Sequence, residues 1–411
     1  MRRRQLLQAG ALAVPALAVA SAPARATTAK VVTGAEQLAR DGWTRLRGKR
    51  FGVLTNPTGV LVDQTHVVDS MVAAGRRPTA VFGPEHGFRG TAQAGGSEGD
   101  YADPRTGVPV YDTYGKDAAQ VAALFRKAGV DTIVFDIADV GARFYTYIWS
   151  LYTAMCAAAA TGAAFLVLDR PNPVGGTAKG PQLDPAFASG VGRKPIVQQH
   201  GLTVGELAEL FDAEFLPSDG GRLAHLDVVE VKGWRRADLA TGLPWVPPSP
   251  NMPTQDTALV YSGTCLFEGT VFSEGRGTTR PFETVGAPDV DWRWAEELNG
   301  LRLPGVRFRE TYFSPTFGKF VGKTCGGVAL HVTDPARFDA IRAAVAMIVL
   351  ARSLYPALFA WRPDDYIDNL SGSDRLRHMV DAGAGVDEVV GAWEAELTAF
   401  RRTRRPYLHY R

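Results

Sequence analysis

Thr-Ala-Val-Phe-Gly-Pro-Glu-His-Gly-Phe-Arg-Gly, residues 79–90, joins an apolar run to a turn and to three polar side chains. The apolar residues at its start are typical of a buried strand, and the Gly-Pro pair that follows ends the run. Glu85, His86 and Arg89 come directly after that turn. Because ligands bind beyond the carboxyl ends of strands in open α/β sheets, the stretch predicts a functional sheet edge.

Strands and helices alternate through the first half of the chain. Four short, nearly continuous apolar runs have the pattern of strands that are covered on both faces. They lie at residues 51–55, 80–82, 132–135 and 164–168. Amphipathic stretches separate the runs, and one of these, residues 117–128, stops at Gly129, a residue typical of helix ends. This rhythm predicts a Rossmann-like, doubly wound parallel sheet.

The second half is less regular. Five prolines between residues 243 and 253 exclude a helix or a central strand there. We therefore expect a Rossmann-like N-terminal domain over residues 27–247 and a smaller α/β (α+β) domain over 248–411. The Gly- and Pro-rich stretch 176–199 is expected to be a long surface excursion, and a helix is expected over residues 334–350.

Polar residues follow several of the predicted strands. Asn56 ends the first strand, Asp136 and Asp139 follow the third, and Asp169 and Arg170 follow the fourth. Single acidic residues at such positions are often helix caps or turn formers. Because the carboxyl ends of parallel strands meet at one edge, the repeated pattern favours a shared cleft.

The first 26 residues have the pattern of a signal peptide. Arg2-Arg3-Arg4 precedes an interrupted apolar run, and Ala24-Arg25-Ala26 is a small-residue cleavage site. The paired arginines favour the twin-arginine route. We expect a secreted, extracytoplasmic protein that is not inserted in the membrane.

Composition limits the classes of function. A net charge of +2 gives no basic field for nucleic acid, and 45% hydrophobic residues are ordinary for a globular protein. The three cysteines form no metal motif, the histidines are scattered, and no Gly-x-Gly-x-x-Gly follows the first strand. No cofactor is therefore expected. A Mg²⁺ or Ca²⁺ site on Asp136, Asp139 and Asp169, in a metal-dependent hydrolase, is one alternative.

Carboxylates at a sheet edge also suit glycoside hydrolysis, which uses one acid and one base or nucleophile. Tyr145 and Tyr147 lie in an aromatic stretch after Arg143 and could stack on sugar faces. The other interpretation of these tyrosines is that they are core residues at a helix entry.

Six ordered motifs resemble the exo-β-N-acetylmuramidase family. They are residues 82–87 (Phe-Gly-Pro-Glu-His-Gly), 135–147, 168–173, 248–253, 268–270 and 273–278. The resemblance implies a two-domain enzyme with its site in the cleft between the domains. It also implies removal of terminal non-reducing β-1,4-linked N-acetylmuramic acid from peptidoglycan fragments, so the expected partner is a peptidoglycan-derived saccharide.

The resemblance carries Glu85 over as the general acid. The second carboxylate is left open among Glu274, Asp136, Asp139 and Asp169. A guanidinium is expected to bind the lactyl carboxylate of the sugar, and the four candidates are Arg143, Arg170, Arg276 and Arg89. The residues expected at the substrate are His86, Arg89, Asn56, Asp139, Arg143, Tyr145, Tyr147, Asp169, Arg170, Asn172, Asn251, Glu268 and Arg276.

One position departs from the family pattern. Relatives often carry Met-Glu in the helix after the Tyr-x-Tyr segment, whereas this chain has Met155-Cys156. A Glu that assisted catalysis would then be missing. This keeps a second alternative, a non-catalytic exported protein that binds muropeptide sugars.

Overall fold

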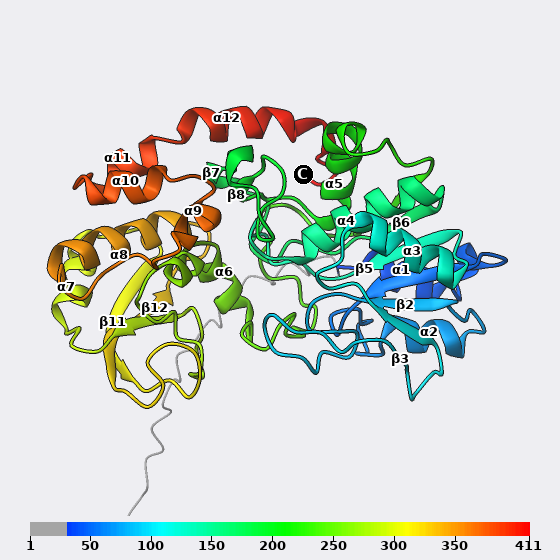
Figure 1. Ribbon diagram of the computed structural model, residues 1–411, viewed down its shortest axis with the longest axis horizontal. Helices are drawn as coiled ribbons and strands as arrows, with labels where there is room; N and C mark the ends of the chain where they lie inside the picture. The colour runs from blue at the N-terminus through cyan, green and yellow to red at the C-terminus, as the bar shows by residue number, and fades with distance from the viewer. Residues whose placement is uncertain (1–30) are drawn as a thin grey trace, which may run out of the picture.

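A seven-stranded sheet forms the centre of the first lobe of the computed structural model, which describes residues 31–411 (Figure 1). The strand order is β3-β4-β2-β1-β5-β6-β9, and only the edge strand β3 runs antiparallel to its neighbour. The strands are β1 (Phe51–Thr55), β2 (Ala80–Gly83), β3 (Tyr101–Ala102), β4 (Pro109–Asp112), β5 (Thr132–Asp136), β6 (Ala164–Leu168) and β9 (Leu226–Val229). The predicted doubly wound, mostly parallel sheet is confirmed.

Helices cover both faces of this sheet because side chains alternate along each strand. In β1, Val53 belongs to the core beneath α1 and α2, whereas Leu54 belongs to the core beneath α3 and α4. The helices are α1 (Gly34–Arg40), α2 (Val67–Ala73), α3 (Ala118–Ala128), α4 (Tyr147–Thr161) and α5 (Val204–Leu210). As predicted, α3 ends at Gly129, whose φ of 64° is the left-handed value that glycine accepts readily.

The second lobe is built on a three-stranded antiparallel sheet in the order β10-β12-β11. Its strands are β10 (Thr284–Ala287), β11 (Val306–Phe313) and β12 (Cys325–Val332). Its helices are α6 (Gln255–Thr264), α7 (Arg293–Gly300), α8 (Ala340–Leu354), α9 (Tyr366–Ser371), α10 (Arg375–Asp381) and α11 (Val386–Gly391). The predicted helix over 334–350 starts later, at residue 340, because the Asp339 carboxylate accepts hydrogen bonds from the first-turn amides. The smaller second domain is thus an α+β unit.

The segment 176–199 is not the surface excursion that we predicted. It contains the hairpin β7 (Lys179–Gln182) and β8 (Val197–Gln199), and its Ile196 and Val197 are fully buried. The Gln198 side chain donates to the Ser262 carbonyl of α6 at 2.7 Å. The prediction failed because partners distant in sequence, in the second lobe, cover an otherwise irregular stretch.

The last helix returns from the second lobe to the first. In Figure 1, α12 (Glu394–Thr403) runs along the top of the molecule between the two lobes. Beyond it, the Tyr410 hydroxyl donates to the Asp169 carboxylate at 2.5 Å. One buried apolar core extends through both lobes, so they pack as a continuous unit.

The predicted domain boundary at 247/248 falls in the irregular segment between β9 and α6, and it stays a prediction. The predicted signal peptide lies outside the residues described. Within residues 31–411, no helix combines the length and apolar character needed to cross a bilayer.

Candidate active site

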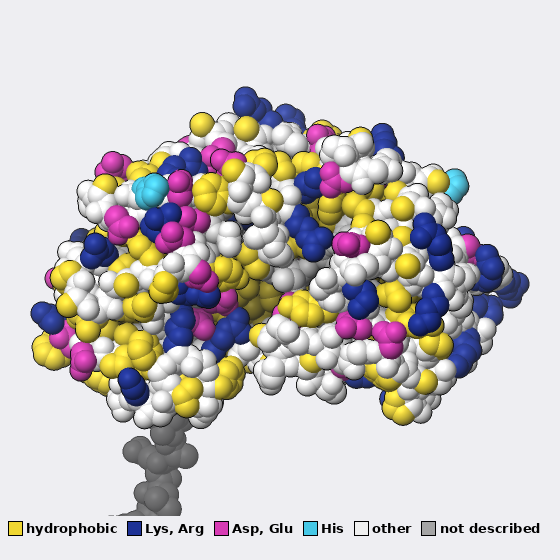
Figure 2. Space-filling model, in the orientation of Figure 1, with side chains coloured by type: hydrophobic (Ala, Val, Ile, Leu, Met, Phe, Trp, Pro, Cys, Tyr) yellow, Lys and Arg dark blue, Asp and Glu magenta, His cyan; other side chains and the backbone are white. Residues whose placement is uncertain are grey.

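A hollow separates the two lobes on the face shown in Figure 2, and charged side chains gather on its wall. A cavity of about 350 Å³ is lined by residues of both lobes. Its first-lobe lining includes Glu85, Thr146 and Trp149, and Tyr366 of α9 comes from the second lobe. The carboxyl edge of the sheet and the second lobe therefore enclose a space in which a sugar ring fits.

Glu85 stands directly beyond the end of β2. One carboxylate oxygen accepts a hydrogen bond from the Gly95 amide at 2.8 Å, and the other accepts one from the Thr146 hydroxyl at 2.7 Å. Burial and the neighbouring Glu85 carboxylate raise the pKa of Tyr114, which lines the same cavity. Two donors on different loops thus hold the half-buried Glu85 carboxylate in a fixed orientation.

The turn after Glu85 is held by backbone geometry. His86 has a φ of 69°, an uncommon value for a residue other than glycine. The ring of His86 is buried, and its Nδ1 lies 3.0 Å from the Ala92 carbonyl, so His86 ties the loop together. Gly87 is required next, because a Cβ there would lie 2.2 Å from the Glu98 side chain. The backbone conformations of His86 and Gly87 therefore fix the turn that places Glu85 on the cavity wall.

Tyr145 and Tyr147 are core residues more than stacking platforms. Their rings pack edge to face with centroids 5.1 Å apart, and both are buried. The Tyr147 hydroxyl donates to the Pro248 carbonyl at 2.5 Å, which fastens the Pro-rich segment over the sheet edge. The aromatic residues on the cavity wall are instead Trp149, Tyr114 and Tyr366.

Three of the four arginines expected at the lactyl carboxylate are already occupied. Arg143 is fully buried, and its guanidinium donates to the carbonyls of Pro181, Ile196 and Leu370. Arg89 lies between the carboxylates of Asp69 and Asp103, at 3.0 and 2.8 Å. Arg170 forms a buried two-point pair with Asp136, with distances of 2.6 and 2.8 Å. Each of these three guanidinium groups is therefore paired within the fold, and lactyl binding by them stays a prediction.

Asp136 and Asp169, two of the candidates for the second carboxylate, are both held by partners within the protein. Asp136 is fully buried against Arg170. Asp169, also fully buried, accepts hydrogen bonds from the Thr203 hydroxyl and the Gly205 amide at 2.8 Å, and from Tyr410. Asp169 thereby fastens α5 and the C-terminus to the end of β6, a structural role that its spacing after the strand does not reveal.

Asp169 makes stability depend on pH. Burial raises the pKa of Asp169 to about 6, above its usual value near 4. The folded protein then binds more protons than the unfolded chain between about pH 4 and pH 6, so this group lowers the free energy of unfolding as pH rises through that window. Asp169→Asn is expected to flatten this slope, which urea midpoints measured at several pH values would reveal. An unchanged slope would contradict the assignment.

The second lobe contributes a cluster of charged groups. Arg276 lies 2.6 Å from Glu268 and 3.4 Å from Glu274, and Lys319 lies 2.9 Å from Glu274. Burial raises the pKa of Glu268. Glu274 is thus buried between two cations, and Arg276 is held by two carboxylates, so the cluster is largely neutralised internally.

The three asparagines expected at the substrate lie in different surroundings. Asn172 accepts from the Val174 amide and donates to the Leu202 carbonyl, so it closes a turn and is not free for substrate. Asn251 is buried in the Pro-rich segment. Asn56 is fully buried, and its side-chain NH₂ has no hydrogen-bond partner within residues 31–411.

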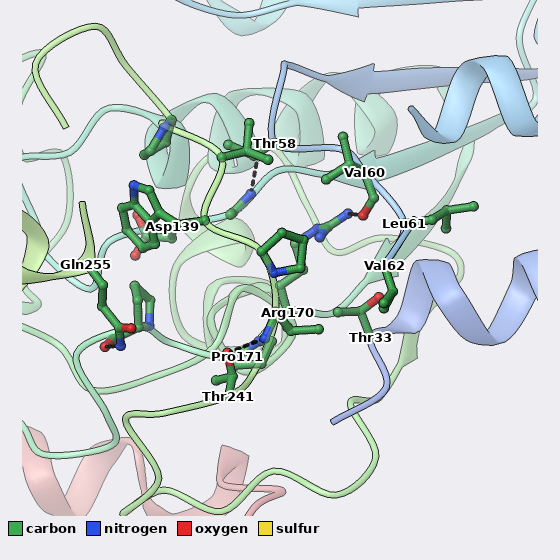
Figure 3. A pocket seen from close by; sticks show the side chains of 17 residues that line it. Thr33, Thr58, Val60, Leu61, Val62, Asp139, Arg170, Pro171, Thr241 and Gln255 are labelled. Atoms are coloured by element: carbon green, nitrogen blue, oxygen red, sulfur yellow. Dashed lines mark hydrogen bonds between the residues drawn. The ribbon is translucent and has the colours of Figure 1, made fainter. Parts of the chain in front are cut away.

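A second, smaller cavity of about 100 Å³ lies against the Pro-rich segment (Figure 3). Figure 3 shows Thr58 and Asp139 toward one end of it and Leu61 and Thr33 toward the other. Arg170 reaches its wall while donating to the Val60 carbonyl at 3.1 Å. The walls of this cavity are mainly apolar. The end near Asp139 offers the polar groups that a sugar needs for hydrogen bonds.

Sequence reasoning missed two cations on the wall of the Glu85 cavity, Lys116 and Arg193. Arg193 donates to the Thr153 hydroxyl of α4 at 2.6 Å and has no carboxylate partner within hydrogen-bond reach in the described chain. It lies in the segment that we interpreted as a surface excursion, and no local pattern brings that segment to the cavity.

In the described part of the chain, the cavity that contains Glu85 is lined neither by a group of metal ligands nor by a cysteine. Residues 31–411 contain no group of three His, Cys, Asp or Glu side chains arranged to hold a metal ion. The aspartates of the alternative metal site are instead divided among Arg170, Tyr410 and His200. The three cysteines are free, and Cys156 is half-buried outside the lining of the Glu85 cavity.

Comparison with known proteins identifies the family. Two models described as the N-terminal and C-terminal parts of exo-β-N-acetylmuramidase NamZ match residues 51–256 and 259–410. The chain belongs to the exo-β-N-acetylmuramidase NamZ family. It is 46% identical over 386 residues to the peptidoglycan β-N-acetylmuramidase NamZ of Bacillus subtilis (strain 168), covering 93% of this chain and 92% of that protein. The resemblance stated from six motifs is thus confirmed.

Solved structures with the NamZ-family fold agree with the architecture. A crystal structure of a DUF1343 family protein from Bacteroides fragilis superposes with a TM-score of 0.85 at 32% identity, covering 93% of this chain and 99% of that one. A second DUF1343 structure from the same organism gives 0.74 at 31% identity with the same coverage. The two-lobed arrangement therefore also occurs in experimental structures.

Proposed function

We infer that this chain is an exo-acting glycoside hydrolase that releases terminal non-reducing β-1,4-linked N-acetylmuramic acid from peptidoglycan fragments. Membership of the NamZ family supports this activity. The observation that carries it is the Glu85 carboxylate, fixed by Gly95 and Thr146 in a cavity that both lobes line. A sugar-sized, partly aromatic cavity with one oriented carboxylate suits hydrolysis of a terminal glycosidic bond.

Glu85 is the proposed general acid. As the bond between the anomeric carbon and the glycosidic oxygen breaks, Glu85 transfers its proton to that oxygen, and the aglycone leaves as an alcohol. A water molecule supplies the hydroxyl that ends on the anomeric carbon, and its other proton passes to a carboxylate of the site. The Gly95 amide and the Thr146 hydroxyl then stabilise the carboxylate that forms, since both donate to its oxygens. Positive charge that develops at the anomeric carbon requires a second, ionised carboxylate.

The direct test compares two peptidoglycan-derived disaccharides, one with terminal N-acetylmuramic acid and one with terminal N-acetylglucosamine. The purified mature chain is expected to release free N-acetylmuramic acid from the first and nothing from the second, as followed by liquid chromatography with mass detection. Binding of the first disaccharide without release would favour the non-catalytic sugar-binding alternative.

Arg193 is the proposed contact of the lactyl carboxylate. A charged hydrogen bond contributes about 1.5–3 kcal/mol, so Arg193→Ala is expected to raise KM for a chromogenic β-N-acetylmuramide roughly 10- to 100-fold with little change in kcat. Arg193→Lys should recover part of the loss. Lys116→Ala is the matched control, because it removes another positive charge from the same cavity wall. An unchanged KM for Arg193→Ala would contradict this role.

We also propose that the protein acts outside the cytoplasm. The basic start, the apolar run and the cleavage site within residues 1–26 support export by the twin-arginine route, and a peptidoglycan substrate lies in that compartment. Replacing Arg2, Arg3 and Arg4 by lysine should leave the unprocessed chain in the cytoplasmic fraction on an immunoblot. Normal export of this variant would argue against the twin-arginine route.

A further inference from the structure

Three buried polar atoms in the segments that follow the neighbouring strands β1 and β5 make no hydrogen bond of normal geometry within residues 31–411, although Ser249 lies near the Tyr145 hydroxyl and Tyr147 near Asn56. They are the side-chain NH₂ of Asn56, Oδ1 of Asp139 and the hydroxyl of Tyr145, and all three residues are at most 8% exposed. The Thr58 hydroxyl joins this neighbourhood, because it donates to Asn56 at 2.6 Å and accepts from the Ala138 amide at 2.8 Å. Since leaving buried polar atoms unpaired costs free energy, their convergence points to a polar ligand.

Asp139 is held unsymmetrically. Its Oδ2 accepts hydrogen bonds from the Gly141 amide at 2.7 Å and from Nε2 of His200 at 3.0 Å. The Leu202 amide donates to the other ring nitrogen of His200 at 3.2 Å, which fixes the tautomer that has its proton on Nε2. One carboxylate oxygen is therefore fixed in place while Oδ1 stays free, although the residue is only 7% exposed.

His200 is itself supported from far along the chain. It is fully buried, and Arg404, just beyond α12, donates to its carbonyl at 2.8 Å. The C-terminal helix thus holds the His200 turn, which in turn holds Asp139. Such a layered support is typical of a carboxylate whose orientation matters for function.

One segment connects Asp139 with the proposed acid. Residues 139–147 start at Asp139 and include Thr146, whose hydroxyl holds Glu85. Tyr145 lies between them: burial, and then the nearby Tyr147, Asp139 and Glu85, raise the pKa of its hydroxyl. In the sheet, β1 lies between β2 and β5, so Glu85, Asn56 and Asp139 follow the carboxyl ends of three neighbouring strands. Tyr147 fastens the Pro-rich segment over that edge.

The other candidates are less available. Arg170 pairs with Asp136, four hydrogen-bond donors surround the fully buried Asp169, and Glu274 lies between Arg276 and Lys319. Among the four candidates, Asp139 alone combines three properties. It has no Lys or Arg partner in the described chain, its hydrogen-bond donors all contact one oxygen, and its other oxygen is free.

We propose that Asp139, oriented by His200, is the second carboxylate of the site and that its free Oδ1 stabilises the positive charge that develops at the anomeric carbon. This rests on the proposed function. The side-chain NH₂ of Asn56 and the hydroxyl of Tyr145 form hydrogen bonds with polar groups of the same sugar. His200 is a positioning residue, since it acts through Asp139.

The test measures kcat and KM for a chromogenic β-N-acetylmuramide. Removing an electrostatic group of this kind costs about 10²- to 10³-fold in kcat, so Asp139→Asn is expected to show that loss with KM changed less than about threefold. Formate is expected to restore part of the activity of Asp139→Ala by entering the space of the missing carboxylate. His200→Gln, which keeps a donor, should retain more kcat than His200→Ala at equal KM.

Asp103→Asn is the matched control, because Asp103 is equally buried but both of its oxygens are bonded, to Arg89 and Thr106. Its kcat should stay near that of the wild type. Wild-type kcat in Asp139→Asn, or no formate rescue of a folded Asp139→Ala, would overturn the proposal while leaving the proposed function standing. No release of N-acetylmuramic acid by the wild type would overturn the proposed function, and the proposal with it.

Discussion

Replacing Glu85 by glutamine is expected to lower kcat for a β-N-acetylmuramide with a poor leaving group by about 10²- to 10⁴-fold, the range that a positioned general acid contributes. Glutamine has nearly the same shape and keeps an oxygen that can accept from Gly95 or Thr146. It has no acidic proton to transfer to the glycosidic oxygen. The fold should therefore survive, with a thermal midpoint close to that of the wild type.

The leaving group separates acid catalysis from a structural role of Glu85. A dinitrophenyl β-N-acetylmuramide needs little protonation because its phenolate leaves readily, so Glu85→Gln should lose far less activity on this substrate than on the natural disaccharide. Thr146→Val removes one donor to the carboxylate and should have a smaller effect. An equal loss on both substrates would assign Glu85 to binding or folding, and wild-type activity would remove it from the mechanism.

Asp136→Ala is expected to lower the free energy of unfolding by about 3–5 kcal/mol, because it leaves the buried Arg170 guanidinium without its carboxylate. Only the Val60 carbonyl would still accept from that group. Urea-induced unfolding, followed by intrinsic tryptophan fluorescence, measures the difference. The double variant Asp136→Leu with Arg170→Met should recover much of the loss, since it removes both charges.

An exposed ion pair provides the comparison. Glu394→Ala breaks the pair with Arg401 on α12, where both side chains are more than 40% exposed, and should change stability by less than about 1 kcal/mol. A similarly small change in Asp136→Ala, together with a large loss of kcat, would return Asp136 to the list of catalytic candidates. The structural assignment of the Asp136–Arg170 pair depends on this contrast.

The sheet, the capped helices and the position of Glu85 were predictable because they depend on local properties. Apolar runs predicted β1, β2, β5 and β6 within a residue of their ends, and Gly129 ended α3 where expected. Residues 203–206 also follow a local rule, since Thr203 and Glu206 form a capping box with hydrogen bonds in both directions. Torsion preferences and side-chain periodicity act over a few residues, so they are readable from the chain itself.

The availability of each charged side chain was decided only by the tertiary structure. Arg143, Arg170 and Asp169 follow strands just as Glu85 does, yet their partners lie up to 241 residues away. Those partners hold the three side chains inside the protein, whereas Glu85 stays half-buried on the cavity wall. Arg193 reached the cavity through a hairpin that only long-range packing orders. By itself, the sequence determined the edge of the sheet and the position of Glu85 on it, because strand patterns and turns depend on neighbouring residues. The tertiary structure determined which charged side chains stay free, because their partners are distant in the sequence.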